Sequence, residues 1–558
     1  MVSNSTIADL LIPKVEFTPE DLRTRYPSRA LPEGAMVTRF APSPTGFFHI
    51  GGLYTALISH KLARQSQGVF FLRIEDTDKK REVEGAADLV IQSLRKYGLI
   101  PDEGETGPGL EVGQYGPYRQ SARVDIYHTF VYRLLLEEKA YACFATPEEL
   151  EEIRSQQEKE KIRPGYYGPW AIWRNRSQEE VRDALNAGKP YVIRLKSPGD
   201  INQRVLFSDL IRGELELPEN DQDIVILKSD GLPTYHAAHV IDDHLMGTTH
   251  VLRGDEWVSS VPLHLQLFQA FGWVPPLFGH IAPIQKMDGN SRRKLSKRKD
   301  PEASVLYYDE QGYPKEAVIE YLMNLADSGF EEWRTNHLSK SYYDFNLEIS
   351  RCSRSGALFD AAKLGSISKE VIGSLNAIET YEQGLHWATQ YNPALASLMS
   401  RDPVYSQNIL NIERESEKVR KDITKWSDLE YEIGYFFDDY FFEKSLDPAS
   451  FQGIENLDDI QRAIQEFIDG YDESDDKDQW FHKLKIIASN HGYAESTKAF
   501  KKNPTEFKGH VGDIAKLIRM LLTGRNQSPD LWEIMRVMGK ARCAQRLNHL
   551  ETLVKKGS

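Results

Sequence analysis

The fold is decided by Arg39–Gly52, which reads RFAPSPTGFFHIGG. Apolar residues at 36–40 predict a short strand, the prolines of 41–46 stiffen a loop, and a helix is expected over 51–66. The glycine pair lets a phosphate approach the helix start, where free N–H groups and the helix dipole favour an anion. His49 can donate a hydrogen bond to such a phosphate. A plain turn-forming glycine pair is the alternative for this stretch taken alone.

The same strand–loop–helix order continues on both sides of this stretch. Alternating strands and helices predict a parallel sheet covered by helices. Residues 100–120, rich in Gly and Pro, are expected to be a crossover. The chain has neither GxxxxGK[ST] nor GxGxxG, so a P-loop or dinucleotide fold is not supported. The expected core elements are strands at 36–40, 69–74, 224–227 and 250–253 and helices at 51–66, 84–97 and 256–271.

A second stretch, 292–299 (RRKLSKRK), carries six cationic residues in eight. A mobile basic loop can clamp a pyrophosphate leaving group while charge develops on it. A nuclear-import-like run and a solvated loop are the alternatives if this stretch is considered alone.

Together, HIGG and KLSKR resemble the paired motifs of class I aminoacyl-tRNA synthetases. The resemblance is closest to bacterial glutamyl-tRNA synthetases. The related glutaminyl enzymes typically have a PEPNG-type loop in place of SPTG and lack the DDHLMG and RGDEW stretches. The matching stretches are RFAPSPTG (39–46), LRIEDTD (72–78), GPYRQS (116–121), KSDGLPTYH (228–236), IDDHLMG (241–247), HVLRGDEW (250–257) and KLSKR (294–298).

This resemblance implies an α/β class I synthetase fold. It consists of a Rossmann-like (HUP) catalytic core with a mixed α/β insert, plus an all-α C-terminal anticodon-binding region. The expected parts are an N-terminal extension (1–35), a split catalytic domain (36–118 and 224–300), a connective insert that binds the acceptor stem (119–223), a stem-contact helical domain (301–375) and the α-helical anticodon-binding region (376–558).

Glutamate carries two carboxylates, and guanidinium groups are their natural partners. The resemblance places Arg39, with Tyr235, on the side-chain carboxylate and Arg253 on the α-carboxylate. The alternative is that each arginine is a structural ion-pair partner.

The substrate ammonium is expected near Glu75, which follows a buried strand, with Ser43 and the Ala41 carbonyl as helpers. A surface ion pair is the alternative for Glu75. At His239 many relatives have Asn near the α-carboxylate. A neutral histidine donates one hydrogen bond and a protonated one adds charge, so the contact made by His239 is left open between the substrate and a supporting position behind it.

The resemblance also implies an ATP site at the two motifs. His49, Gly51, Lys294 and Lys297 are the expected catalytic residues, and Lys297 is expected to face pyrophosphate. Trp257 packed into the core is the alternative to an adenosine contact. ATP chemistry implies Mg²⁺, with no assigned carboxylate ligand. The expected ATP-binding residues are His49, Gly51, Gly52, Glu256, Trp257, Lys294, Leu295 and Lys297.

The cysteines Cys143, Cys352 and Cys543 lie far apart in the sequence. They cannot build a disulfide scaffold or a four-thiolate zinc site. Some family members carry a Cys-x-Cys zinc site in the insert, but Cys143 stands alone there, so no structural zinc is expected. A reducing, cytoplasmic location fits this usage. No stretch approaches the ~18 apolar residues of a membrane helix, so no membrane span is expected.

The charge is unevenly distributed along the chain. The net charge of −14 argues against nucleic-acid binding, yet residues 496–558 carry 13 Lys/Arg against 5 Asp/Glu. This basic region predicts a polyanion-binding module, with a solvated helical face as the alternative. The expected tRNA contacts are Lys516, Arg519 and Arg525.

The implied reaction is ATP-dependent ligation of L-glutamate to tRNA(Glu) through a glutamyl-adenylate, releasing AMP and pyrophosphate. Charging of tRNA(Gln) as well is left open, and a monomer is the family expectation. A non-catalytic RNA-binding paralogue, an enzyme that glutamylates a tRNA base and a nucleotidylyltransferase are the alternatives. The intact motifs argue against the first, and the long region after KLSKR argues against the other two.

Overall fold

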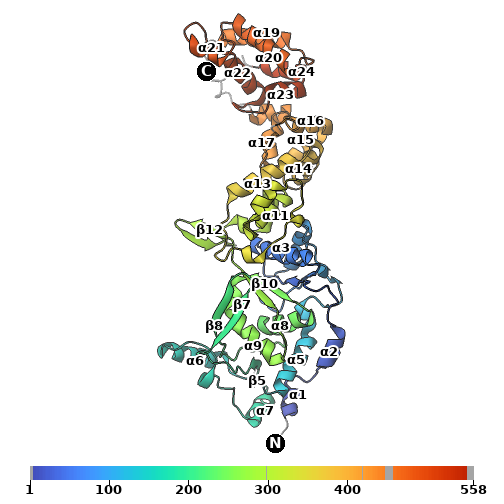
Figure 1. Cartoon of the computed structure of the whole chain (residues 1–558), viewed down its shortest axis with the longest axis vertical. Helices are drawn as coiled ribbons and strands as arrows, with labels where there is room; N and C mark the ends of the chain where they lie inside the picture. Colours follow the sequence, from blue (N-terminus) through green and yellow to red (C-terminus); the bar gives the residue numbers. More distant parts are fainter. Residues whose placement is uncertain (1–3, 297, 418, 446–456, 550–558) are drawn as a thin grey trace. The chain divides into compact units, whose positions relative to one another are not determined.

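The computed structural model describes residues 4–296, 298–417, 419–445 and 457–549 (Figure 1). It divides into two compact units. Unit 1 comprises Met1–Tyr307 and Ile319–Asp360, and unit 2 comprises Tyr308–Val318 and Ala361–Ser558. Within the described ranges, no helix is long and apolar enough to cross a membrane.

Unit 1 contains a parallel sheet that begins with β1 (Val37–Phe40) and β2 (Val69–Leu72). β3 (Glu103–Gly107) pairs in parallel with β2, and β4 (Leu110–Val112) runs antiparallel to β3. The expected crossover at 100–120 therefore contains two strands. Their glycines and acidic residues are poor strand formers, so pairing with β2 overrides local propensity here.

A second run of strands lies beside β1. β10 (His250–Gly254) pairs in parallel with β11 (Leu277–Ile281), and the Thr249 amide, just before β10, donates to the Val37 carbonyl at 3.0 Å. β7 (Arg204–Asp209) and β8 (Gly213–Pro218) extend this sheet beyond β11. The carboxyl ends of β1, β2 and β10 bring Arg39, Glu75 and Arg253 toward one region of unit 1.

Helices enclose these strands. α3 (Ile50–Gln65) packs on β1, β2 and β10. α5 (Val124–Leu136), α8 (Tyr235–Leu245) and α9 (Val261–Phe271) pack against one another, as Figure 1 shows, and share one buried apolar core. The helix expected from 256 begins instead with a 3₁₀ turn, Asp255–Ser260, and α9 follows at Val261.

The insert of unit 1 is divided between two sheets: β7 and β8 extend the sheet of β10 and β11, whereas β5 (Ala140–Cys143) and β6 (Val192–Leu195) belong to a separate antiparallel sheet. β5 and β9 (Val225–Leu227) flank β6. The strand expected at 224–227 thus pairs with the insert and not with the parallel sheet. A short apolar run predicts a buried strand but does not specify its partner.

Further helices complete unit 1. Two N-terminal helices pack against α5, and the Tyr191 hydroxyl donates to the Leu11 carbonyl at 2.6 Å. The remaining elements are α1 (Asn4–Leu11), α2 (Pro19–Arg25), α4 (Ala86–Lys96), α6 (Pro147–Lys159), α7 (Gln178–Asn186), β12 (Gln285–Asp288), β13 (Ser291–Lys294) and α12 (Phe330–Asn336). α10 (Val305–Gln311) and α11 (Lys315–Ala326) each contribute residues to both units.

Unit 2 is built from helices around its own apolar core. Its helices are α13 (Ala361–Ser374), α14 (Ala377–Tyr391), α15 (Pro393–Arg401), α16 (Pro403–Asn411), α17 (Leu429–Gly434), α18 (Asp438–Tyr440), α19 (Leu457–Gly470), α20 (Lys477–Asn490), α21 (Thr497–Lys502), α22 (Val511–Thr523), α23 (Leu531–Met538) and α24 (Lys540–Leu547).

Candidate active site

His49 joins the two sequence motifs. It caps the N-terminus of α3, where its Nδ1 accepts a hydrogen bond from the Gly51 amide at 2.9 Å. Its Nε2 lies 3.3 Å from the Leu295 carbonyl. Because Nδ1 accepts, the ring hydrogen belongs on Nε2, which donates to Leu295. The HIGG helix start is thereby linked directly to the KLSKR segment.

A cavity of about 360 Å³ opens beside this link. A Cβ added at Gly52 would come within 2.7 Å of the Phe48 ring, so a larger residue here would have to displace this buried side chain. Trp257 is not among the lining residues, and Lys297 lies outside the described residues. The predicted ATP-binding residues that line the cavity are His49, Gly51, Gly52, Glu256, Lys294 and Leu295.

The basic stretch is more ordered than the loop expected from its sequence. Ser291–Lys294 forms β13, antiparallel to β12. Arg293 is held between Asp288 at 2.8 Å and Asp300 at 2.5 Å, while Lys294 Nζ lies 3.4 Å from Glu256 Oε2. Arg293 is thus committed to the hairpin, whereas the half-exposed Lys294 lies at the cavity.

A buried charge network lies at the ends of β1 and β2. Asp243 Oδ1 accepts from Arg39 Nε at 3.2 Å and from Arg73 Nη1 at 2.8 Å. Arg73 Nη2 donates to Glu75 Oε1 at 3.0 Å. The neighbouring guanidiniums hold the pKa of Asp243 well below its usual range despite burial. Burial raises the pKa of Glu75, against the opposing effect of Arg73 and Arg39.

The SPTG loop runs along Glu75. The Glu75 amide donates to the Pro42 carbonyl at 3.0 Å, which places Ala41 and Ser43 on either side of that contact. Ser43 is exposed and Ala41 is half-buried. The structure therefore brings these three predicted residues into one region.

Arg253 is a buried cation with neutral neighbours. The residue is 5% exposed, and burial lowers its pKa. His264 Nδ1 lies 3.1 Å from Nη2, and His280 Nε2 lies 3.1 Å from Nε. The Tyr235 hydroxyl lies 3.5 Å from Nη1. Within the described ranges no carboxylate forms an ion pair with Arg253, so its charge is left for an anionic ligand.

His239 is buried next to both Asp243 and Arg253. Its Nδ1 lies 2.6 Å from Asp243 Oδ2 and its Nε2 lies 3.4 Å from Arg253 Nη1. Burial lowers the pKa of His239 to about 3, so the ring is neutral near pH 7. A neutral ring with its hydrogen on Nδ1 offers Nε2 as an acceptor to Arg253. His239 therefore lies between Asp243 and Arg253.

Tyr235 is the centre of an aromatic group beside Arg253. Its ring stacks on His239 with centroids 5.5 Å apart, and the Trp257 ring lies 4.3 Å away. The Trp257 carbonyl accepts from Arg253 Nη2 at 3.4 Å. In this structure Trp257 packs on Tyr235, while its contact with adenosine remains a prediction.

Several residues of this region were not predicted. Asp243 lies inside the quoted IDDHLMG stretch, where two consecutive acids after an apolar residue could have indicated a buried partner for an arginine. Arg73 likewise lies inside the quoted LRIEDTD stretch, two residues before its partner Glu75. Asp209, His264 and His280 had no such signal, because their partners lie far away in the sequence.

No cluster of metal ligands is present among the described residues. In the cavity lining, Glu256 is the one carboxylate, so the residues present do not form a magnesium site. Cys143 is buried, and its thiol donates to the Tyr166 hydroxyl at 3.2 Å.

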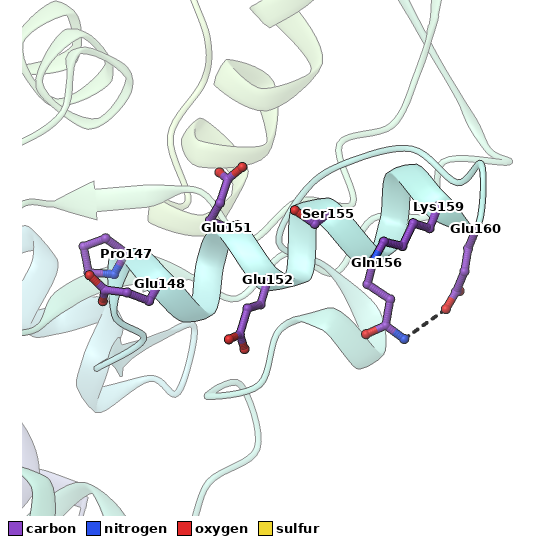
Figure 2. A pocket seen from close by; sticks show the side chains of 8 residues that line it. All are labelled: Pro147, Glu148, Glu151, Glu152, Ser155, Gln156, Lys159 and Glu160. Carbon is purple, nitrogen blue, oxygen red and sulfur yellow. Dashed lines mark hydrogen bonds between the residues drawn. The ribbon is translucent and has the colours of Figure 1, made fainter.

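A larger hollow of about 900 Å³ runs along α6 and is open to solvent (Figure 2). All the side chains drawn there come from this one segment, and Gln156 donates to Glu160 at 3.0 Å. Glu148, Glu151 and Glu152 give this hollow a negative charge that disfavours a polyphosphate. The cavity at His49 is the better nucleotide site, although it is smaller.

The predicted tRNA contacts lie on and after α22. Lys516 is exposed. Arg519 Nε donates to Ser528 Oγ at 3.1 Å. The Arg525 guanidinium lies 3.5 Å from the centre of the Tyr431 ring, and its Nη1 is 3.4 Å from Glu432 Oε2. Arg525 is thus already engaged within unit 2.

Known proteins resemble the chain over nearly its whole length. Residues 35–365 match the family model described as tRNA synthetases class I (E and Q), catalytic domain, and residues 386–550 match the anticodon binding domain. A glutamate–tRNA ligase of Clostridium perfringens strain 13 is 48% identical, covering 98% of this chain and 100% of that protein. The glutamate–tRNA ligase of Sorangium cellulosum is 45% identical over 95% of this chain and 97% of its own length.

A solved structure supports the same assignment. The crystal structure of a glutamate tRNA ligase from Elizabethkingia meningosepticum, in complex with its amino acid, is similar with a TM-score of 0.75. It is 30% identical and covers 93% of this chain and 100% of that one. The predicted fold class, a class I synthetase catalytic domain with a helical anticodon-binding domain, is confirmed. The chain belongs to the glutamate–tRNA ligases, within the class I tRNA synthetases.

Proposed function

We propose that this chain ligates L-glutamate to tRNA(Glu) at the expense of ATP, through a glutamyl-adenylate. The observation that carries this proposal is the pair of buried arginines at one site. Among the residues that the structure describes, the partners of Arg253 are all neutral, and Arg39 shares Asp243 with Arg73. Family membership supports the same reaction.

Glutamate fits this site by charge. Arg253 receives the α-carboxylate, because an anion supplies the countercharge that its histidine neighbours lack. Arg39 and Tyr235 receive the side-chain carboxylate. Glu75, with the Ala41 carbonyl and Ser43, receives the ammonium. His239 touches Arg253 and not the substrate.

ATP occupies the cavity beside His49. Its phosphates lie at the α3 N-terminus, where Gly51 and Gly52 allow close approach. Glu256 and Trp257 lie toward adenosine, and Leu295 borders the nucleotide. Lys294 and Lys297 bind the phosphates and stabilise the charge that develops on departing pyrophosphate. Magnesium would accompany the ATP phosphates and offset part of their negative charge.

The two stages of the reaction need positioning more than acid–base chemistry. The α-carboxylate oxygen attacks the α-phosphorus of ATP, the bond to pyrophosphate breaks, and the acyl-adenylate forms. The 2′-hydroxyl of the terminal adenosine of tRNA then attacks the acyl carbon and releases AMP.

The tRNA lies along the remaining parts of the chain. The catalytic domain consists of 36–118 and 224–300. The insert 119–223 between these two parts holds the acceptor stem of the tRNA, and the helical domain 301–375 makes further contacts with the tRNA stem. Residues 376–558 read the anticodon, with Lys516 and Arg519 as its contacts and Arg525 supporting them from its place on Tyr431. The extension 1–35 packs on the body. A monomeric, cytoplasmic enzyme remains the expectation from the resemblance.

The test is aminoacylation with radiolabelled glutamate and, separately, glutamine, on purified tRNA(Glu) and tRNA(Gln). We expect glutamate on tRNA(Glu) and loss of at least about a hundredfold in kcat for Lys297→Ala, because a charge contact made in the transition state is removed. Charging of tRNA(Gln) as well would identify a non-discriminating enzyme that depends on a partner amidotransferase. Failure to charge either tRNA by the folded protein would contradict the proposal.

A further inference from the structure

We propose that Asp209 and His280 are positioning residues that orient Arg253 for the α-carboxylate of glutamate. The proposal rests on the proposed function, because it takes Arg253 as the group that binds this carboxylate. Both residues are buried, His280 fully and Asp209 to 2% exposure.

Asp209 is fixed at the end of β7. Its Oδ1 accepts from the backbone amides of Ile211 at 3.0 Å and Arg212 at 2.9 Å. Its Oδ2 lies 2.5 Å from His280 Nδ1 on β11. Hydrogen bonds from His280 and these amides lower the pKa of Asp209 despite burial, so the carboxylate is ionised near pH 7. An ionised carboxylate only accepts, which places a hydrogen on His280 Nδ1.

The other nitrogen of His280 therefore faces Arg253. Nε2 lies 3.1 Å from Arg253 Nε, which always carries a hydrogen. Burial lowers the pKa of His280, so the ring is neutral and Nε2 accepts. In the opposite tautomer the hydrogen on His280 Nε2 would point at the hydrogen on Arg253 Nε, and no hydrogen bond could form. Asp209 thus selects the form of His280 that can hold Arg253.

A second histidine pair works on the other edge of the guanidinium. His264 Nδ1 lies 3.1–3.2 Å from both Arg253 terminal nitrogens, and His264 Nε2 lies 3.0 Å from His236 Nδ1. Together the neutral rings fix the guanidinium plane without neutralising it. A carboxylate in place of these rings would hold Arg253 equally well but would compete with the substrate.

The diagnostic variant is Asp209→Asn. Its size is unchanged and its Oδ1 can keep the bonds to the Ile211 and Arg212 amides. Its NH₂ group, however, donates to His280 Nδ1 and forces the hydrogen onto Nε2, against Arg253. We expect the KM for glutamate in aminoacylation to rise at least about tenfold, the loss typical of a hydrogen bond to a charged group. The KM for ATP should stay within about twofold, because the ATP cavity is not contacted.

His280→Phe and His280→Gln form the companion pair. Phenylalanine fills the space but accepts nothing, whereas the glutamine Oε1 can replace the Nε2 acceptor. We expect the KM for glutamate to rise in His280→Phe and to return to within about threefold of the parent in His280→Gln. This rescue would not occur if His280 served packing alone.

His60→Phe is the matched control. His60 is also buried in unit 1, and its Nε2 accepts from Arg64 Nε at 3.4 Å, away from the candidate site. It should lose stability but keep the parent KM for glutamate. Thermal unfolding of each variant shows that the protein assayed is folded.

The outcomes separate this proposal from the one on which it depends. Arg253→Lys should raise the KM for glutamate, and if it does not, the assignment of the α-carboxylate to Arg253 is wrong. If Arg253→Lys raises KM while folded His280→Phe and Asp209→Asn do not, the positioning role alone is wrong. Equal increases in KM for glutamate and ATP would also overturn it. If Asp209→Asn does not fold, the phenylalanine and glutamine pair decides.

Discussion

Asp243 is the buried carboxylate that supplies negative charge to two buried guanidinium groups of the site. It accepts from Arg39, Arg73 and the Thr248 hydroxyl, and His239 faces its second oxygen. Asp243→Asn keeps the size but leaves two buried guanidiniums short of a negative charge. We expect the free energy of unfolding of unit 1 to fall by about 3 kcal/mol, measured by urea denaturation.

The pH dependence of this loss is fixed by the direction of the pKa shift. The pKa of Asp243 in the folded protein lies well below its unfolded value. Its stabilising contribution is therefore complete above the unfolded pKa and disappears as pH falls through the folded one. The difference between parent and Asp243→Asn should be constant from pH 6 to 8. Asp288→Asn, which removes an exposed partner of Arg293, should cost under about 1 kcal/mol; a similar loss in both variants would contradict the role of Asp243.

At this scale the sequence predicted residues that belong to continuous motifs. Arg39, Glu75 and Arg253 each lie near the carboxyl end of a short strand, and the structure brings them into one region. His264 and His280 were missed because a single histidine in an apolar run gives no sign of its partner. The question of what His239 contacts could be posed from sequence, and its distances to Asp243 and Arg253 favour a supporting position, which remains a prediction.

The helix α8 gives unit 1 an acid-sensitive element. Burial lowers the pKa values of His236 and His244 to about 4 and that of His239 to about 3. Between pH 6.5 and 4 the unfolded chain binds more protons than the folded one, so stability falls as pH falls. We expect the slope to approach about 1.4 kcal/mol per pH unit for each of these histidines.

Urea unfolding of unit 1 at pH 7, 6 and 5 measures this slope. His244→Gln removes one of the three groups without touching Arg253 and should reduce the slope. The matched control, His482→Gln, changes an exposed histidine of unit 2 and should leave the slope for unit 1 as in the parent. A stability that is level from pH 7 to 5 would show that these rings take up protons equally in the folded and unfolded protein, and the lowered pKa values would be wrong.

At the scale of elements, periodicity predicted the helices better than the strands. The expected helix at 51–66 corresponds to α3, Ile50–Gln65, because its apolar spacing and its glycine start agree. The strands β3 and β4 were missed, since their side chains are small or charged and only pairing with β2 makes them strands. The strand at 224–227 was found but joins β6, because strand partners are chosen by tertiary packing.

For the whole molecule, the two kinds of chemistry fall in different units. The candidate glutamate and ATP residues lie in unit 1, and the basic residues of 496–558 lie in unit 2. The negative net charge of the chain does not oppose tRNA binding if the tRNA contacts the basic residues of unit 2. Local phosphate contacts also make such binding weaken as salt is raised.

Arg519→Glu tests this division of labour. Arg519 is half-buried on α22, and a reversed charge there should weaken tRNA binding about tenfold or more at 0.1 M salt. ATP binding by unit 1 should change less than about twofold, since its cavity contains no residue of 496–558. Filter binding of tRNA(Glu) and the KM for ATP measure the two effects. Arg519→Lys keeps the charge and should bind tRNA within about threefold of the parent. If both affinities fall together, or neither falls, Arg519 does not contact tRNA.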